Sequence, residues 1–204
     1  AFVVVIVGPV GMEDPSDLAE WVTRFPDIQA ARVVENITYL AGLMLGIPLF
    51  LALYRALRQT SLAAALFGSV LGIVGLVPMM VSSNPPVAHA PLSELYHASG
   101  ATPVDQATVA LIWQAIWGII DLTTYIGFFI VPVGLIILGL GMFGAPTFGK
   151  GFGAVTVALG LIGFAAAVMQ IMDPASMTGV ASYFAIIISY LVLGWKVFRV
   201  SRIS

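Results

Sequence analysis

The sequence of 204 residues contains no cysteine and few charged residues. The lack of cysteine excludes disulfides, thiolate nucleophiles and cysteine-ligated metal or iron–sulfur sites. Charged residues make up 9% of the chain and hydrophobic residues 60%, whereas a soluble domain carries roughly 25% charged residues because its surface must be solvated. A net charge of −2 gives no reason to expect a nucleic-acid partner. We therefore expect an integral membrane protein.

Motifs that mark common enzymes are also missing. The chain has no G-x-S-x-G, no H-E-x-x-H, no Walker loop and no Rossmann glycine fingerprint. It has no arginine-rich voltage-sensing helix and no inverted pair of broken helices of the transporter kind. We therefore expect a protein without enzymatic chemistry of its own, and we predict no cofactor and no metal site.

Apolar segments of about 20 residues can cross a bilayer as helices. Five are long enough, and a shorter apolar run at residues 1–10 is interpreted as the end of a first span; a signal-peptide remnant is the alternative. The sequence thus predicts an all-α, polytopic membrane bundle of about six transmembrane helices, the first one incomplete, forming a single domain over residues 1–204. The five full segments are residues 37–57, 62–81, 118–143, 152–172 and 177–198.

Basic residues fall mainly on one side of this arrangement. Cytoplasmic loops are enriched in lysine and arginine, so that side is interpreted as cytoplasmic, with both termini inside. Only Arg24 and Arg32 lie on the other side, among acidic residues. The six on the cytoplasmic side are Arg55, Arg58, Lys150, Lys196, Arg199 and Arg202.

Two outer-face segments, residues 11–36 and 82–117, are too long for simple connections. In the first, Phe25-Pro26 is expected to end a short helix, which either lies on the membrane surface or packs on the bundle. In the second, Pro85-Pro86 is expected to interrupt helical structure, residues 91–98 to form a short helix, and Asp105 to cap a helix that runs toward Phe143. Their apolar residues predict either a docking surface for other subunits or a cap over the bundle.

Three acidic residues are candidates for function, because charge near lipid is costly. Glu35, Asp121 and Asp173 should lie at a similar depth, near the outer boundary of the spans. The functional interpretation is a cluster that binds a cation or relays protons. The alternative, which the sequence favours, is helix capping and solvation at the interface.

The two histidines offer weaker candidates. Glu94 and His97 are three residues apart and share a face if helical, and Glu-x-x-His is a component of carboxylate di-metal sites. Such sites need two such pairs and two more carboxylates that project into a bundle core, whereas this chain has one pair, and it lies in an outer-face segment. A haem held by two histidines needs core-facing helical positions, and neither His89 nor His97 is expected to occupy one. Aromatic residues near the outer boundary, among them Trp113 and Trp117, are expected to be interface anchors; a platform for a quinone, lipid or pigment is the alternative.

Several short segments resemble a broad bacterial family of six-span membrane proteins known only as a domain of unknown function. The resemblance covers about residues 30–200, and Leu53-Tyr54-Arg55-Ala56-Leu57 is its most specific part. It implies six helices and a bacterial cytoplasmic (inner) membrane, and it carries no catalytic residues. The other segments are Thr38–Gly42, Gly68 with Gly72 and Gly75, Ser93–Tyr96 and Phe148–Gly153.

The sequence leads to a function hypothesis and an alternative. We expect a non-catalytic accessory or structural subunit of a larger membrane complex, or a homo-oligomer, whose partners are membrane lipids and other membrane protein subunits or itself, not nucleic acid. The motive is the scarcity of polar groups within the spans. The alternative is a binder or transporter of a small molecule, lipid or ion with an acidic outer mouth.

Overall fold

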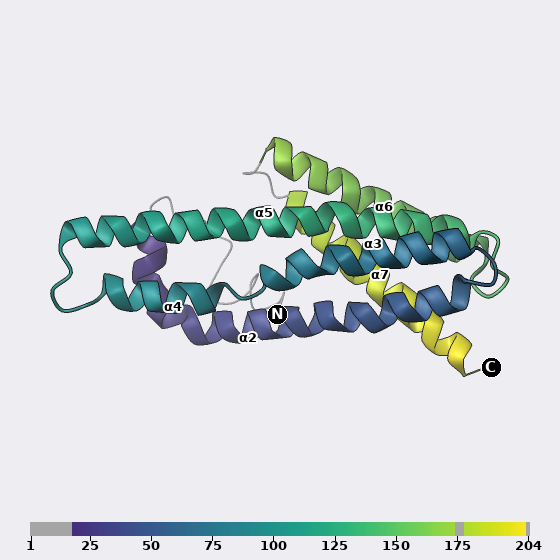
Figure 1. The fold of residues 1–204 in the computed structure, drawn as a ribbon, viewed down its shortest axis with the longest axis horizontal. Helices are drawn as coiled ribbons and strands as arrows, with labels where there is room; N and C mark the ends of the chain where they lie inside the picture. Colours follow the sequence, from purple (N-terminus) through teal and green to yellow (C-terminus); the bar gives the residue numbers. More distant parts are fainter. Residues whose placement is uncertain (1–17, 174–177, 203–204) are drawn as a thin grey trace. The chain divides into compact units, whose positions relative to one another are not determined.

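The computed structural model describes residues 18–173 and 178–202, and these form six α-helices without a strand (Figure 1). Five are long and apolar enough to cross a membrane. The chain is therefore a multi-pass helical membrane bundle, as predicted, while the expected partial span at residues 1–10 lies outside the described residues. The helices are α2 (Leu18–Leu57), α3 (Leu62–Val81), α4 (Pro85–Tyr96), α5 (Pro103–Met142), α6 (Gly149–Met172) and α7 (Thr178–Ser201).

The helix α2 is continuous through Pro26, so the prediction that Phe25-Pro26 ends a short helix is wrong. A proline inside a helix removes one backbone hydrogen bond and usually bends the axis. Val22, Phe25 and Ile28 are buried on both sides of the proline, and their burial compensates for the lost bond. Figure 1 shows the first, purple turns of α2 at an angle to the turns that follow.

The helix α4 begins at Pro85, six residues before the predicted start at residue 91. Proline is well tolerated in the first turn of a helix, because the N–H that it lacks would have no partner there. The same Pro85-Pro86 pair that prevents α3 from continuing therefore starts α4. Because of this earlier start, His89 is part of the helix and faces the interior of unit 1.

Thr102, rather than Asp105, caps α5. The Thr102 hydroxyl donates to the Asp105 carboxylate at 2.7 Å and accepts from the Asp105 backbone N–H at 3.3 Å, and the carboxylate also accepts from the Thr102 N–H at 2.9 Å. This reciprocal arrangement is a capping box, with Asp105 as its third helical residue. The long helix predicted from this point is confirmed, since α5 runs for 40 residues to Met142.

The chain divides into two compact units. Unit 1 contains Ala1–Gly42 and Met80–Thr123, and unit 2 contains Leu43–Met79 and Thr124–Ser204. The described parts of both outer-face segments, 11–36 and 82–117, fall in unit 1. The first half of α2, all of α4 and the first half of α5 therefore pack together.

The core of unit 1 joins the two outer-face segments. Val22 and Phe25 of α2 are buried against Val109 and Trp113 of α5. The Gln106 side chain donates to the Tyr96 carbonyl at 3.2 Å and ties α5 to the end of α4. Residues that pack around this core are Trp21, Ala90, Leu92, Tyr96 and Trp117.

In unit 2, α5 packs backbone to backbone against α3 and α6 through glycines. A Cβ atom on Gly134 would lie 2.7 Å from the Gly68 carbonyl oxygen, and one on Gly153 would lie 2.9 Å from the Gly139 carbonyl oxygen. Only glycine permits such a close approach of two helices. The small-residue pair Gly68/Gly72 is thus used within the chain. Ala154 and Ala158, two small residues that are also four positions apart, are exposed on α6.

Candidate functional site

The three acidic candidates are divided between the two units. Glu35 forms an ion pair with Arg32 at 3.0 Å on the same turn of α2, and Asp121 is an exposed residue of α5; both belong to unit 1. Asp173 belongs to unit 2, where it is the C-cap of α6 and its N–H donates to the Met169 carbonyl at 2.9 Å. Glu35 therefore belongs to an ion pair, and Asp173 lies at the end of a helix.

Glu94 and His97 both lie at the exposed end of α4. One ring nitrogen of His97, Nδ1, lies 2.8 Å from the Ser93 carbonyl oxygen, a distance at which the nitrogen donates. The ring also contacts Tyr96 edge-on, with centroids 5.2 Å apart. Within the described ranges, no three or more histidine, aspartate or glutamate side chains are grouped so that they could hold a metal ion.

His89 occupies a core-facing position on α4, so the expectation that neither histidine does so is wrong. Its side chain is only 1% exposed. The ring stacks on Trp113 of α5, with centroids 3.9 Å apart and planes 19° apart, and it lies 5.2 Å from the ring of Trp117. Phe25 of α2 meets both His89 and Trp113 edge-on, at 6.3 and 5.1 Å. We call Phe25, His89, Trp113 and Trp117 the aromatic cluster.

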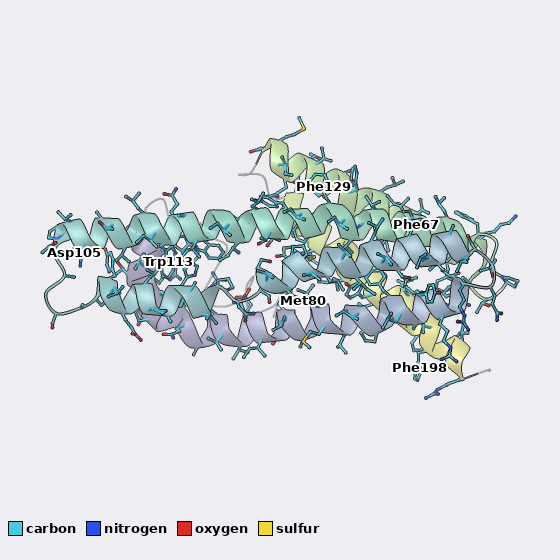
Figure 2. All side chains as sticks on the ribbon, viewed as in Figure 1. Phe67, Met80, Asp105, Trp113, Phe129 and Phe198 are labelled. Atoms are coloured by element: carbon cyan, nitrogen blue, oxygen red, sulfur yellow. The ribbon has the colours of Figure 1, made fainter. Side chains whose placement is uncertain are left out.

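The sequence contained a signal for this cluster. With a helix start at Pro85, positions His89, Ser93 and Tyr96 fall on one face at spacings of four and three residues. Placing the helix start at residue 91 removed His89 from the helix and hid the pattern. Trp113, expected to be an interface anchor, is instead buried at the centre of unit 1 (Figure 2).

Among the described residues, three side-chain polar atoms of α4 and α5 are buried without a hydrogen-bond partner. They are His89 Nε2, Ser93 Oγ and Trp113 Nε1. Leaving a buried polar atom unpaired costs about 1–3 kcal/mol, so a group of three is unusual in a folded protein. The indole N–H only donates, the hydroxyl donates and accepts, and the imidazole nitrogen does either according to its tautomer. Each of these atoms could form a hydrogen bond with a small polar molecule.

Burial also changes the acid–base behaviour of the cluster. Removal of the imidazole from water lowers the pKa of His89 from 6.5 to about 4. His89 is therefore neutral near pH 7, and at that pH it can both donate and accept a hydrogen bond.

Comparison with known proteins gives no family for the chain: no protein family model, no curated protein and no solved structure matches it. The resemblance to the bacterial six-span family stays a prediction.

Proposed function

We propose that this chain is a non-catalytic membrane protein that works as a subunit, with its outer-face segments in contact with another protein chain. The observation that carries the proposal is an apolar stripe along the exposed side of the first half of α5. Val104 is 74% exposed and Leu111 is 65% exposed, and Ile119 and Leu122 continue the stripe. The opposite side of the same stretch carries the buried Val109 and Trp113.

The length of α5 supports a position beyond the bilayer core for the start of this stripe. Forty residues of helix are about 60 Å long, roughly twice the thickness of the hydrocarbon core. Within unit 2, Met79 near the end of α3 meets Gly127 of α5. The 20 residues of α3 alone match the core thickness, at about 30 Å. A helix of 40 residues that crosses the core therefore extends beyond it, and Val104 lies in its first turn.

An apolar stripe outside the hydrocarbon core would face water unless a protein covers it. Contiguous exposed apolar patches on proteins usually mark sites of interaction. The occupant that we propose is another membrane protein chain or a second copy of this one. The setting that we propose is a bacterial cytoplasmic membrane with both termini inside, supported by the resemblance and by the six basic residues on that side.

The lack of cysteine allows a direct test. A variant with a single cysteine in place of Leu111 would be treated with a membrane-impermeant maleimide, once in native membranes and once in nanodiscs that contain one chain each. We expect Leu111→Cys to be protected in native membranes and reactive in the single-chain nanodiscs. Gln114→Cys, at an exposed polar position three residues further along α5, is the control for access. Equal protection of the cysteine in both preparations would mean that lipid or the chain itself covers the stripe. Equal reactivity in both would mean that nothing covers the stripe. Either result would contradict the proposal.

A second candidate function is favoured by the three unpaired polar atoms at His89, Ser93 and Trp113. In this alternative, unit 1 closes around a small polar ligand, and the protein is a binder or transporter. The segment 82–117 would then be protected from hydrogen exchange in the isolated monomer, and more so with ligand. A subunit interface predicts protection that appears only in the intact assembly.

A further inference from the structure

Six basic residues lie at one end of unit 2. Arg55 and Arg58 belong to the end of α2 and the turn after it, Lys150 to the first turn of α6, and Lys196, Arg199 and Arg202 to the end of α7. Contacts join these three places. A Cβ atom on Gly144, before α6, would lie 3.7 Å from Thr60, before α3, and the Lys196 ammonium lies 4.9 Å from the centre of the Phe152 ring of α6.

The charge at this end is not balanced within unit 2. The sequence ranges 43–79 and 124–204 contain one acidic residue, Asp173, and it lies at the opposite end of α6. In the parts of the chain that the structure describes, the single ion pair found joins Arg32 to Glu35 in unit 1. Lys150 lies near the N-terminus of α6, where the helix dipole disfavours a cation. An anion bound at this end would balance the positive charge and would interact favourably with the N-terminus of α6.

Three of the cations lie over aromatic rings. Besides Lys196 over Phe152, the Arg199 guanidinium lies 5.1 Å from the centre of the Trp195 ring, and the Arg202 guanidinium lies 4.4 Å from that of Phe198. Stacking on a ring leaves the N–H groups at the edge of a guanidinium free to donate. The side chain of Trp195 is 58% exposed and that of Phe198 is 50% exposed. Each therefore offers an apolar surface beside a cation.

We propose that this end of unit 2 binds the headgroups of anionic phospholipids. A phosphate oxygen pair matches the donor geometry of arginine, and basic residues next to membrane helices attract anionic lipids. The exposed rings favour a lipid over a free phosphate, because an acyl chain can cover Trp195 and Phe198 while the phosphate contacts the guanidinium groups. The inference does not depend on the proposed subunit function, since it uses no residue of unit 1.

The test measures lipid binding by the purified full chain in a non-ionic detergent, with native mass spectrometry to count bound lipids. We expect phosphatidylglycerol to bind at least about tenfold more tightly than phosphatidylcholine, which has a phosphate but no net charge, because each basic residue near a lipid surface strengthens binding by about fivefold. Arg199→Gln/Arg202→Gln should lose this preference by about tenfold or more. Arg199→Lys/Arg202→Lys should keep most of it.

The matched control is Arg24→Gln/Arg32→Gln, which removes the same charge from unit 1 and should leave phosphatidylglycerol binding within about twofold. If the α7 variant does not fold, the exposed Lys150→Gln serves instead, with an expected loss of about fivefold. Equal binding of the two lipids, or equal losses in the two double variants, would overturn the proposal. Displacement of the lipid by millimolar inorganic phosphate would also overturn it, because a soluble anion would then be the ligand.

Discussion

The imidazole of His89 lies flat on the indole of Trp113, with ring centroids 3.9 Å apart, and this stack joins α4 to α5 at the centre of unit 1. In the part of the chain that the structure describes, His89 Nε2 and Trp113 Nε1 are both buried and neither has a hydrogen-bond partner. The contact is therefore held by ring packing alone. Its stability should depend on the charge of the imidazole.

The first prediction concerns acid. The folded-state pKa of His89 is lowered to about 4, so the contribution of this residue to stability is fully present above pH 6.5 and is lost as pH falls toward 4. A shift of this size corresponds to at most about 3 kcal/mol. We expect the wild type to lose more stability than His89→Phe between pH 7.5 and 4.5, measured by thermal unfolding in detergent.

His97→Phe is the control for this experiment, because His97 is exposed at the end of the same helix. It should follow the wild-type pH profile. A His89→Phe profile that parallels the wild type would show that His89 does not set the acid sensitivity of unit 1.

The second prediction concerns the glycine contacts of α5. Gly134→Ala places a Cβ atom 2.7 Å from the Gly68 carbonyl oxygen, a backbone atom that moves only if the helices separate. We expect a loss of about 1–3 kcal/mol in the free energy of unfolding, as for other overpacked positions. Gly118→Ala, with no atom within 4 Å of the added methyl group, should be neutral or stabilising by up to about 1 kcal/mol. Equal effects of the two substitutions would contradict the close α3–α5 contact.

The third prediction concerns topology. Thr147 lies in the connection between α5 and α6, on the side with the six basic residues, and Ser99 lies between α4 and α5; both are exposed. In intact cells, an impermeant thiol reagent should modify Ser99→Cys and not Thr147→Cys, and permeabilisation should expose the second. The opposite pattern would place the termini outside.

The lengths of the apolar segments were sufficient to predict most of the fold. The limits of α3 agree with the expected span 62–81, because the segment is uniformly apolar and ends where proline follows. The errors arose at prolines. Pro26 was expected to end a helix, yet α2 continues past it because neighbouring side chains are buried. Pro85-Pro86 was expected only to interrupt a helix, yet α4 begins there.

The candidate site was harder to predict than the fold. Sequence reasoning selected charged residues near the membrane boundary, such as Glu35, because charge there is costly. The unpaired polar atoms belong instead to uncharged side chains, those of His89, Ser93 and Trp113. A serine or a tryptophan cannot be recognised as a candidate from the sequence until its burial is known. Only the position of His89 could have been found earlier, through the correct start of α4.

The glycine contact between α3 and α5 has a consequence for how the chain enters the membrane. Gly72 and Gly134 are about 60 residues apart, so at a synthesis rate of 5–20 residues per second several seconds pass before the partner of α3 is made. During that interval Gly68 and Gly72 of α3 lack the helix against which they pack in the folded chain. Ribosome pausing within residues 85–134 would lengthen this interval, and we expect the yield of folded protein to depend on the rate at which this stretch is translated.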